Sequence, residues 1–248
     1  MRFMIMHRTN AYWESGATPS PELIARVGQL IGGLVQSGSL LAAEGLRPSS
    51  QGLRLKFANG QRAVTDGPFT ESKEMIAGFA ILRVASLEDA VRWATRFAEV
   101  LGDDLELDVR PVTEAWDIGI GEKPAGLTAR RFMVVQKNLS VDGCRALSPA
   151  QGAAMGKLME EMGRAGVLLS AEGLEASAKG ARLLSQGGRP IVMDGPFTES
   201  KELLGGFVIV KVQTLQEAVE YAKRYFTEVG AEEVDVRQVA EPPSPPSG

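Results

Sequence analysis

The string DGPFTESKE occurs twice in this chain, at residues 66–74 and again at residues 194–202. The repetition extends outward from it, because Ala43-Glu44-Gly45-Leu46 returns as Ala171-Glu172-Gly173-Leu174 and Asp108-Val109-Arg110 returns as Asp235-Val236-Arg237. Length alone would allow one or two domains. The ordered series of matches indicates two copies of one structural unit.

The copies divide the 248 residues into two predicted domains, residues 1–113 and 131–239. A segment rich in glycine and proline, residues 114–130, is the predicted linker, and residues 240–248 form a predicted flexible tail. With 44% hydrophobic and 23% charged residues, the composition is that of a globular protein in which each copy can bury a core.

Charge and cysteine content exclude several classes of function. The net charge of -4 gives no basic stripe for a nucleic-acid backbone, so we expect no nucleic-acid partner. Cys144 is the single cysteine, and neither a metal-binding pattern nor a phosphate-binding glycine loop occurs, so we expect no metal and no cofactor. Residues 1–10 have neither the apolar core nor the small-residue cleavage site of a signal peptide, so we expect none, and no apolar run is long enough to span a membrane. A cytoplasmic protein without a membrane partner is expected.

Local patterns in the first copy predict an alternation of strands and helices. Residues 3–6 form an apolar strand, and a polar loop through Trp13 and Gly16 follows. A helix capped by Ser20 then carries one apolar face, built from Ile24, Val27, Ile31, Leu34 and Val35. Strands are predicted at 40–46, 53–57 and 62–65, with a hairpin turn at Asn59-Gly60; a strand at 78–84, a helix capped by Ser86 and a strand at 107–112 complete the unit.

This order is the split βαβ arrangement of a ferredoxin-like α+β domain, in which both helices cover one face of the sheet. The other face would expose a large apolar surface if each copy stood alone. We therefore predict two tandem ferredoxin-like domains packed sheet to sheet, as an internal pseudo-dimeric α/β barrel. A free sheet edge would still leave homo-oligomer formation open.

The doubled DGPFTESKE string, with the Ala-Glu-Gly-Leu strand before it and Gly-Phe after it, resembles the signature of the YCII-related, DGPF-type proteins. The resemblance implies a dimeric α/β barrel of bacterial origin, and such proteins are often described beside extracytoplasmic-function sigma factors. In some single-domain relatives, a histidine near the start of the first helix beside an aspartate is the suspected catalytic pair. Here Leu23 and Gln151 stand at the positions that correspond to that histidine, so this catalytic pair is not expected.

Two polar clusters are the candidate sites for catalysis or ligand binding. Carboxylates at the end of apolar strands can act as bases when desolvated or can bind cations, and a strand-end role bonded to loop amides is the alternative. The first cluster consists of Glu44, Asp66, Lys73 and His7, and the second of Glu172, Asp194, Lys201 and Gln136.

Within the repeated string, Asp66-Gly67-Pro68 fits a structural turn and Phe69 a core position. The charged remainder stays identical in both copies while the flanking residues diverge, which favours a ligand-binding role for Thr70, Lys73, Thr198 and Lys201. The alternative is structural, with Thr70 as a helix cap and Lys73 as the ion-pair partner of Glu44.

Two functional hypotheses follow from these patterns. In the first, the clefts bind an unknown small molecule and can perform acid/base chemistry on it. In the second, the barrel is a non-catalytic regulatory or protein-interaction module linked to sigma-factor-dependent transcription control.

Overall fold

The structure of the chain is a computed structural model that describes residues 1–69, 75–197 and 203–241. In the first copy the elements are β1 (Arg2–Arg8), α1 (Ala11–Glu14), α2 (Pro21–Gln36), β2 (Leu40–Gly45), η1 (Ser49–Gln51), β3 (Leu53–Ala58), β4 (Gln61–Asp66), β5 (Ile76–Val84), α3 (Leu87–Leu101), β6 (Leu105–Pro111) and η2 (Ala115–Ile118). In the second copy they are β7 (Arg130–Asn138), α4 (Pro149–Arg164), β8 (Leu168–Gly173), η3 (Ser177–Lys179), β9 (Ala181–Gln186), β10 (Arg189–Asp194), β11 (Leu204–Lys211), α5 (Leu215–Val229) and β12 (Glu233–Gln238).

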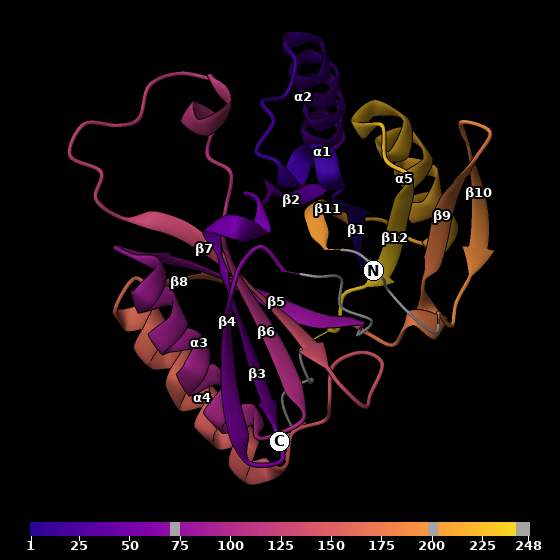
Figure 1. Ribbon diagram of the computed structural model, residues 1–248. Helices are drawn as coiled ribbons and strands as arrows, with labels where there is room; N and C mark the ends of the chain where they lie inside the picture. Colours follow the sequence, from indigo (N-terminus) through magenta and orange to yellow (C-terminus); the bar gives the residue numbers. More distant parts are fainter. Residues whose placement is uncertain (70–74, 198–202, 242–248) are drawn as a thin grey trace.

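The strands form two six-stranded antiparallel sheets (Figure 1). The first sheet has the order β10-β9-β12-β1-β11-β2, and the second has the order β4-β3-β6-β7-β5-β8. Each sheet contains a ferredoxin-like group of four strands, extended at one end by a hairpin. The predicted α+β class, with two ferredoxin-like units packed sheet to sheet, is confirmed.

The two sheets do not correspond to the two sequence copies, because each sheet contains strands of both. β1 and β2 leave the remainder of the first copy and pair with β11 and β12 of the second, while β7 and β8 pair with β5 and β6. The chain crosses from one sheet to the other between β2 and β3, and again between β8 and β9. Each ferredoxin-like unit is thus assembled from both copies.

The helices begin where the sequence places their caps. The side chains of Ser20 and Ser86 accept the backbone N–H of Leu23 and Asp89, which starts α2 and α3. In the predicted loop before α2, the side chain of Asn10 caps an additional helical turn, α1. The apolar face of α2 is narrower than predicted, since Val35 is exposed and only Leu30 and Leu34 are buried.

Three apolar layers hold the sheets and helices together. α2 and α5 pack on the outer face of the first sheet, and α3 and α4 pack on that of the second (Figure 1). The inner faces meet in a third layer, where the rings of Phe79 and Phe207 lie 5.0 Å apart between their centroids. Met4 and Met6 of β1 enter this inner layer, while Phe3 and Ile5 face the helices. The sheet-to-sheet core therefore covers the apolar faces that the sequence left without a partner.

Candidate functional site

A cavity of about 480 Å³ lies between α2 and the first sheet. α2 contributes Leu23, Ile24, Val27 and Ile31 to its apolar wall. Ile118 and Ile120 of the linker close another side. The cavity thus depends on a segment that the chain contains only once, between its two copies.

His7 and Tyr225 form the neutral polar part of the cavity wall. The Nδ1 atom of His7 lies 2.7 Å from the hydroxyl oxygen of Tyr225. Burial lowers the pKa of His7 to about 4, with further lowering by Arg8 and Arg110, and burial raises the pKa of Tyr225. Both groups are therefore uncharged at neutral pH and offer hydrogen bonds.

Two glycines make room for the imidazole. A Cβ atom on Gly205 would lie 2.6 Å from Nε2 of His7, and one on Gly206 would lie 2.9 Å from its Cε1. Any larger residue at either position would have to displace the ring. The first copy has Ala77 at the position of Gly205, so this close approach belongs to the His7 side of the molecule.

Glu44 lies on the same cavity wall, so the structure brings two of the predicted residues, His7 and Glu44, to one cavity. The carboxylate of Glu44 is in an ion pair with Arg131, which also binds Glu114 at 2.8 Å. Burial raises the pKa of Glu44, and Arg131 opposes this effect only in part. Glu44 joins the two sheets and is not a free base.

The other predicted site residues lie elsewhere or outside the described part of the chain. Asp66 and Asp194 end the exposed strands β4 and β10 and do not line the cavity. Glu172 binds Arg2 at 2.5 Å, which is a second ion pair between the sheets. Thr70, Lys73, Thr198 and Lys201 fall outside the described residues.

In the corresponding region of the second copy, amide side chains stand in place of His7 and Leu23. Gln136, in place of His7, donates to Asn138 at 3.1 Å, and Asn138 donates to the carbonyl of Gly143 at 2.7 Å. Gln151, in place of Leu23, donates to carbonyl oxygens at the end of α3 at 3.1 and 3.2 Å. Phe97 stands where the first sheet has Tyr225, so this region lacks the His7–Tyr225 pair.

The start of each DGPF motif fits tightly against a serine turn. A Cβ atom on Gly67 would lie 1.8 Å from the backbone oxygen of Ser49, which only glycine avoids. The hydroxyl of Ser49 accepts the N–H of Phe69 at 3.1 Å, and the ring of Phe69 lies against the guanidinium of Arg54 at 4.6 Å. This agrees with a structural role for the motif's Asp-Gly-Pro and with Phe69 as a buried residue.

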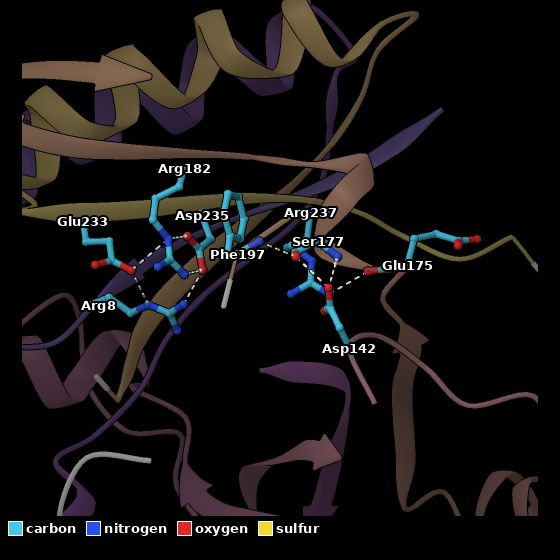
Figure 2. A network of polar contacts seen from close by, with 9 residues as sticks. All are labelled: Arg8, Asp142, Glu175, Ser177, Arg182, Phe197, Glu233, Asp235 and Arg237. Atoms are coloured by element: carbon cyan, nitrogen blue, oxygen red, sulfur yellow. Dashed lines mark hydrogen bonds and ion pairs between the residues drawn. The ribbon is translucent and has the colours of Figure 1, made fainter. Parts of the chain in front are cut away.

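The second copy repeats this arrangement, as Figure 2 shows. Ser177 accepts the N–H of Phe197 at 2.8 Å and donates to Asp142 at 2.6 Å. Asp142 in turn accepts from Arg237 at 3.1 Å, and Arg182 lies 4.5 Å from the centre of the Phe197 ring. Both motifs are thus attached to charged side chains inside the barrel.

Arg54 and Arg182, which contact the phenylalanine rings of the motifs, belong to two buried charge clusters. The first cluster contains Arg54, Glu106, Asp108 and Lys137, and the second contains Arg182, Glu233, Asp235 and Arg8. In the first cluster, Lys137 binds Asp108 at 2.6 Å, and Arg54 binds the same carboxylate at 2.6 Å. Each cluster contains two cations and two anions, so its charges balance, and it links three strands of one sheet: β3, β6 and β7 in the first cluster and β9, β12 and β1 in the second.

Sequence reasoning did not select these clusters, although a signal for them was present. Asp108-Val109-Arg110 and Asp235-Val236-Arg237 place charged residues on alternate positions of apolar strands in both copies. Such a pattern directs two charges per copy toward one face of a buried sheet. Its repetition indicated a shared polar core rather than a surface feature.

Two classes of site find no support in the described residues. Within residues 1–69, 75–197 and 203–241, no group of three histidine, cysteine or acidic side chains could hold a metal ion. None of the helices in these ranges has both the length and the apolar character needed to cross a membrane.

Comparison with known proteins identifies the class of this chain. The YCII-related domain matches it twice, at residues 1–110 and 135–240, and the chain therefore belongs to the YCII-related family. It is also similar to an uncharacterised protein of Rhizobium meliloti (strain 1021), with 32% identity over 78 residues. That match covers 32% of this chain and 63% of the relative, so the chain spans less than two thirds of the relative's length. No solved structure matches the chain.

Proposed function

We propose that this YCII-related protein binds a small, mainly apolar organic molecule in the cavity beside α2. The observation that carries the proposal is the cavity itself, about 480 Å³ in volume, with an apolar wall and the His7–Tyr225 pair. Ligand cavities typically measure about 300–1,000 Å³ and combine an apolar lining with a few convergent polar groups.

The chemistry of the pair favours binding over turnover. A general base works best when its pKa lies near the working pH. His7 has a pKa of about 4, so it is a weak base near neutrality and is suited to hydrogen bonding. Glu44, the carboxylate on the wall, is held by Arg131. Acid/base chemistry therefore has less support here than recognition.

A thermal-shift screen of small organic molecules tests the proposal. Ile24→Trp would fill the cavity from α2, whereas Gln29→Trp places the same side chain on the exposed face of that helix. We expect ligands that raise the Tm of the wild-type protein to lose this effect in Ile24→Trp and to keep it in Gln29→Trp. Ligands that stabilise both variants equally would exclude the cavity as their binding site.

A further inference from the structure

We propose that the natural ligand of this cavity is electrically neutral, with an apolar body and one hydroxyl or carbonyl oxygen that bonds to the His7–Tyr225 pair. This inference rests on the proposed function and specifies its ligand class. It follows from how the charged and titratable groups of the cavity wall are already partnered.

The acidic groups on the wall are bound to arginines. Glu44 is paired with Arg131, and Asp117 is paired with Arg130 at 2.5 Å between Oδ1 and Nη2. Arg131 also holds Glu114 next to the linker turn. A cationic ligand would have to compete with these arginines for each carboxylate, so the wall does not provide a free partner for an amine.

The basic side chains of the wall also offer few ion-pair partners to an anionic ligand. His7 is uncharged at neutral pH, and its one hydrogen bond to another described residue is the contact with Tyr225. Arg47 is the lining cation that has no carboxylate partner in the described ranges, and its Nε atom donates to the exposed Gln51 at 3.3 Å. Among the described lining residues, Arg47 is thus the cation through which an anionic ligand could be held.

The preference for a neutral ligand follows from the cost of desolvation. A charged group that enters an apolar cavity without a counter-ion loses several kcal/mol of hydration, whereas a hydroxyl or carbonyl that keeps one hydrogen bond loses far less. The tyrosine hydroxyl and the imidazole can each donate or accept, depending on the tautomer of the ring. The pair can therefore satisfy either kind of neutral oxygen.

Three probes with one ring system separate the alternatives: 2-naphthol, 2-naphthoate and 2-naphthylmethylammonium, titrated calorimetrically into the full chain at pH 7. We expect 2-naphthol to bind at least about tenfold more tightly than either ion, equivalent to about 1.4 kcal/mol. Its affinity should fall about tenfold in Ile24→Trp, remain unchanged in Gln29→Trp and fall severalfold in Tyr225→Phe. Val27→Trp replaces Ile24→Trp if that variant does not fold, since Val27 also lines the cavity.

Other outcomes would contradict different parts of the argument. If 2-naphthoate binds most tightly and Arg47→Gln abolishes its binding, the neutral ligand class is wrong while the cavity remains a binding site. If the ammonium probe binds most tightly and Ile24→Trp weakens its binding, the neutral ligand class is again wrong and the cavity is again a binding site. If none of the probes binds, the ligand class is overturned, and the thermal-shift screen decides separately whether the cavity binds anything.

Discussion

The two ends of the barrel have corresponding helices and strands but differ in their polar side chains and in the partners of these side chains. Beside α2, His7 and Tyr225 face a cavity that the linker helps to enclose. Beside α4, Gln136 and Gln151 bond to neighbouring polar groups of the protein itself. The two copies share one scaffold, while substitutions such as His7 against Gln136 and a segment that occurs once between the copies make the two ends different.

The buried charge clusters differ in a similar way. Lys137 in the first cluster corresponds to Arg8 in the second. A buried lysine can lose its proton when its partner is removed, whereas an arginine remains charged. The same loss of a carboxylate should therefore have unequal consequences at the two positions.

The largest loss of stability is expected when the carboxylate at the centre of a charge cluster is removed. Asp235→Asn would leave Arg8 and Arg182 with Glu233 as their remaining anion in this cluster, and we expect it to lower the free energy of unfolding by about 3–5 kcal/mol. Asp108→Asn should cost less, because Lys137 keeps Glu106 as a partner at 3.0 Å, whereas Arg8 keeps Glu233 at 3.5 Å. Urea unfolding at pH 7 measures both changes, and equal losses would contradict the distinction between lysine and arginine.

The pH used for this comparison follows from the aspartate pKa values. Burial alone would raise the pKa of Asp235 and Asp108, but the neighbouring cations lower both below the ordinary value of 3.8. Each carboxylate therefore stabilises the fold fully above that value, and this stabilisation is lost as the pH falls through the folded-state pKa. At pH 7 both contributions are present in the wild-type protein.

A smaller effect concerns the pH dependence contributed by His7. Its pKa falls from 6.5 to about 4 on folding, so the unfolded chain takes up a proton first as the pH drops below 6.5. Stability should fall between pH 6.5 and 4, by about 3 kcal/mol at most. His7→Gln, which installs the residue of the other copy, should flatten this part of the profile in urea titrations. An unchanged slope would show that His7 is not buried as a neutral ring.

The hydrogen bond between His7 and Tyr225 should change the free energy of unfolding by less than the burial of the His7 ring does. Tyr225→Phe removes the hydroxyl, and we expect a loss of about 1 kcal/mol in the free energy of unfolding. Phe97→Tyr adds a hydroxyl at the other end, where Gln136 is already bonded to Asn138, so it should give no stabilisation. A stabilised Phe97→Tyr variant would show that the second end can also accept this polar pair.

The smallest effect is expected at the half-exposed ion pair between the sheets. Glu172→Gln removes one carboxylate partner of Arg2 and leaves Glu241 at 3.4 Å, so we expect it to cost less than about 1 kcal/mol because solvent screens the charges. The cost should shrink further in high salt. A loss as large as that of Asp235→Asn would mean that this pair contributes as much to stability as a carboxylate of a buried cluster.

Particular residues show which features the sequence could predict. Ser20 and Ser86 located two helix starts, and the doubled string located the two copies. His7 was selected from the sequence as a candidate, but its partner Tyr225 lies 218 residues later in the chain. Local spacing carries no information about such a distant contact, so the pair could be recognised only in the folded structure.

The sequence by itself determined the duplication, the α+β class and the need for two apolar sheet faces to meet. Only the tertiary structure decided that β1 pairs with β11 rather than with β5. The reason is that both strands present the same Gly-Phe pair, Gly78-Phe79 and Gly206-Phe207, so local patterns favour either partner equally. The tertiary structure also decided where the cavity lies, because its wall joins β1, α2, β2, α5 and the linker, which are far apart in the sequence.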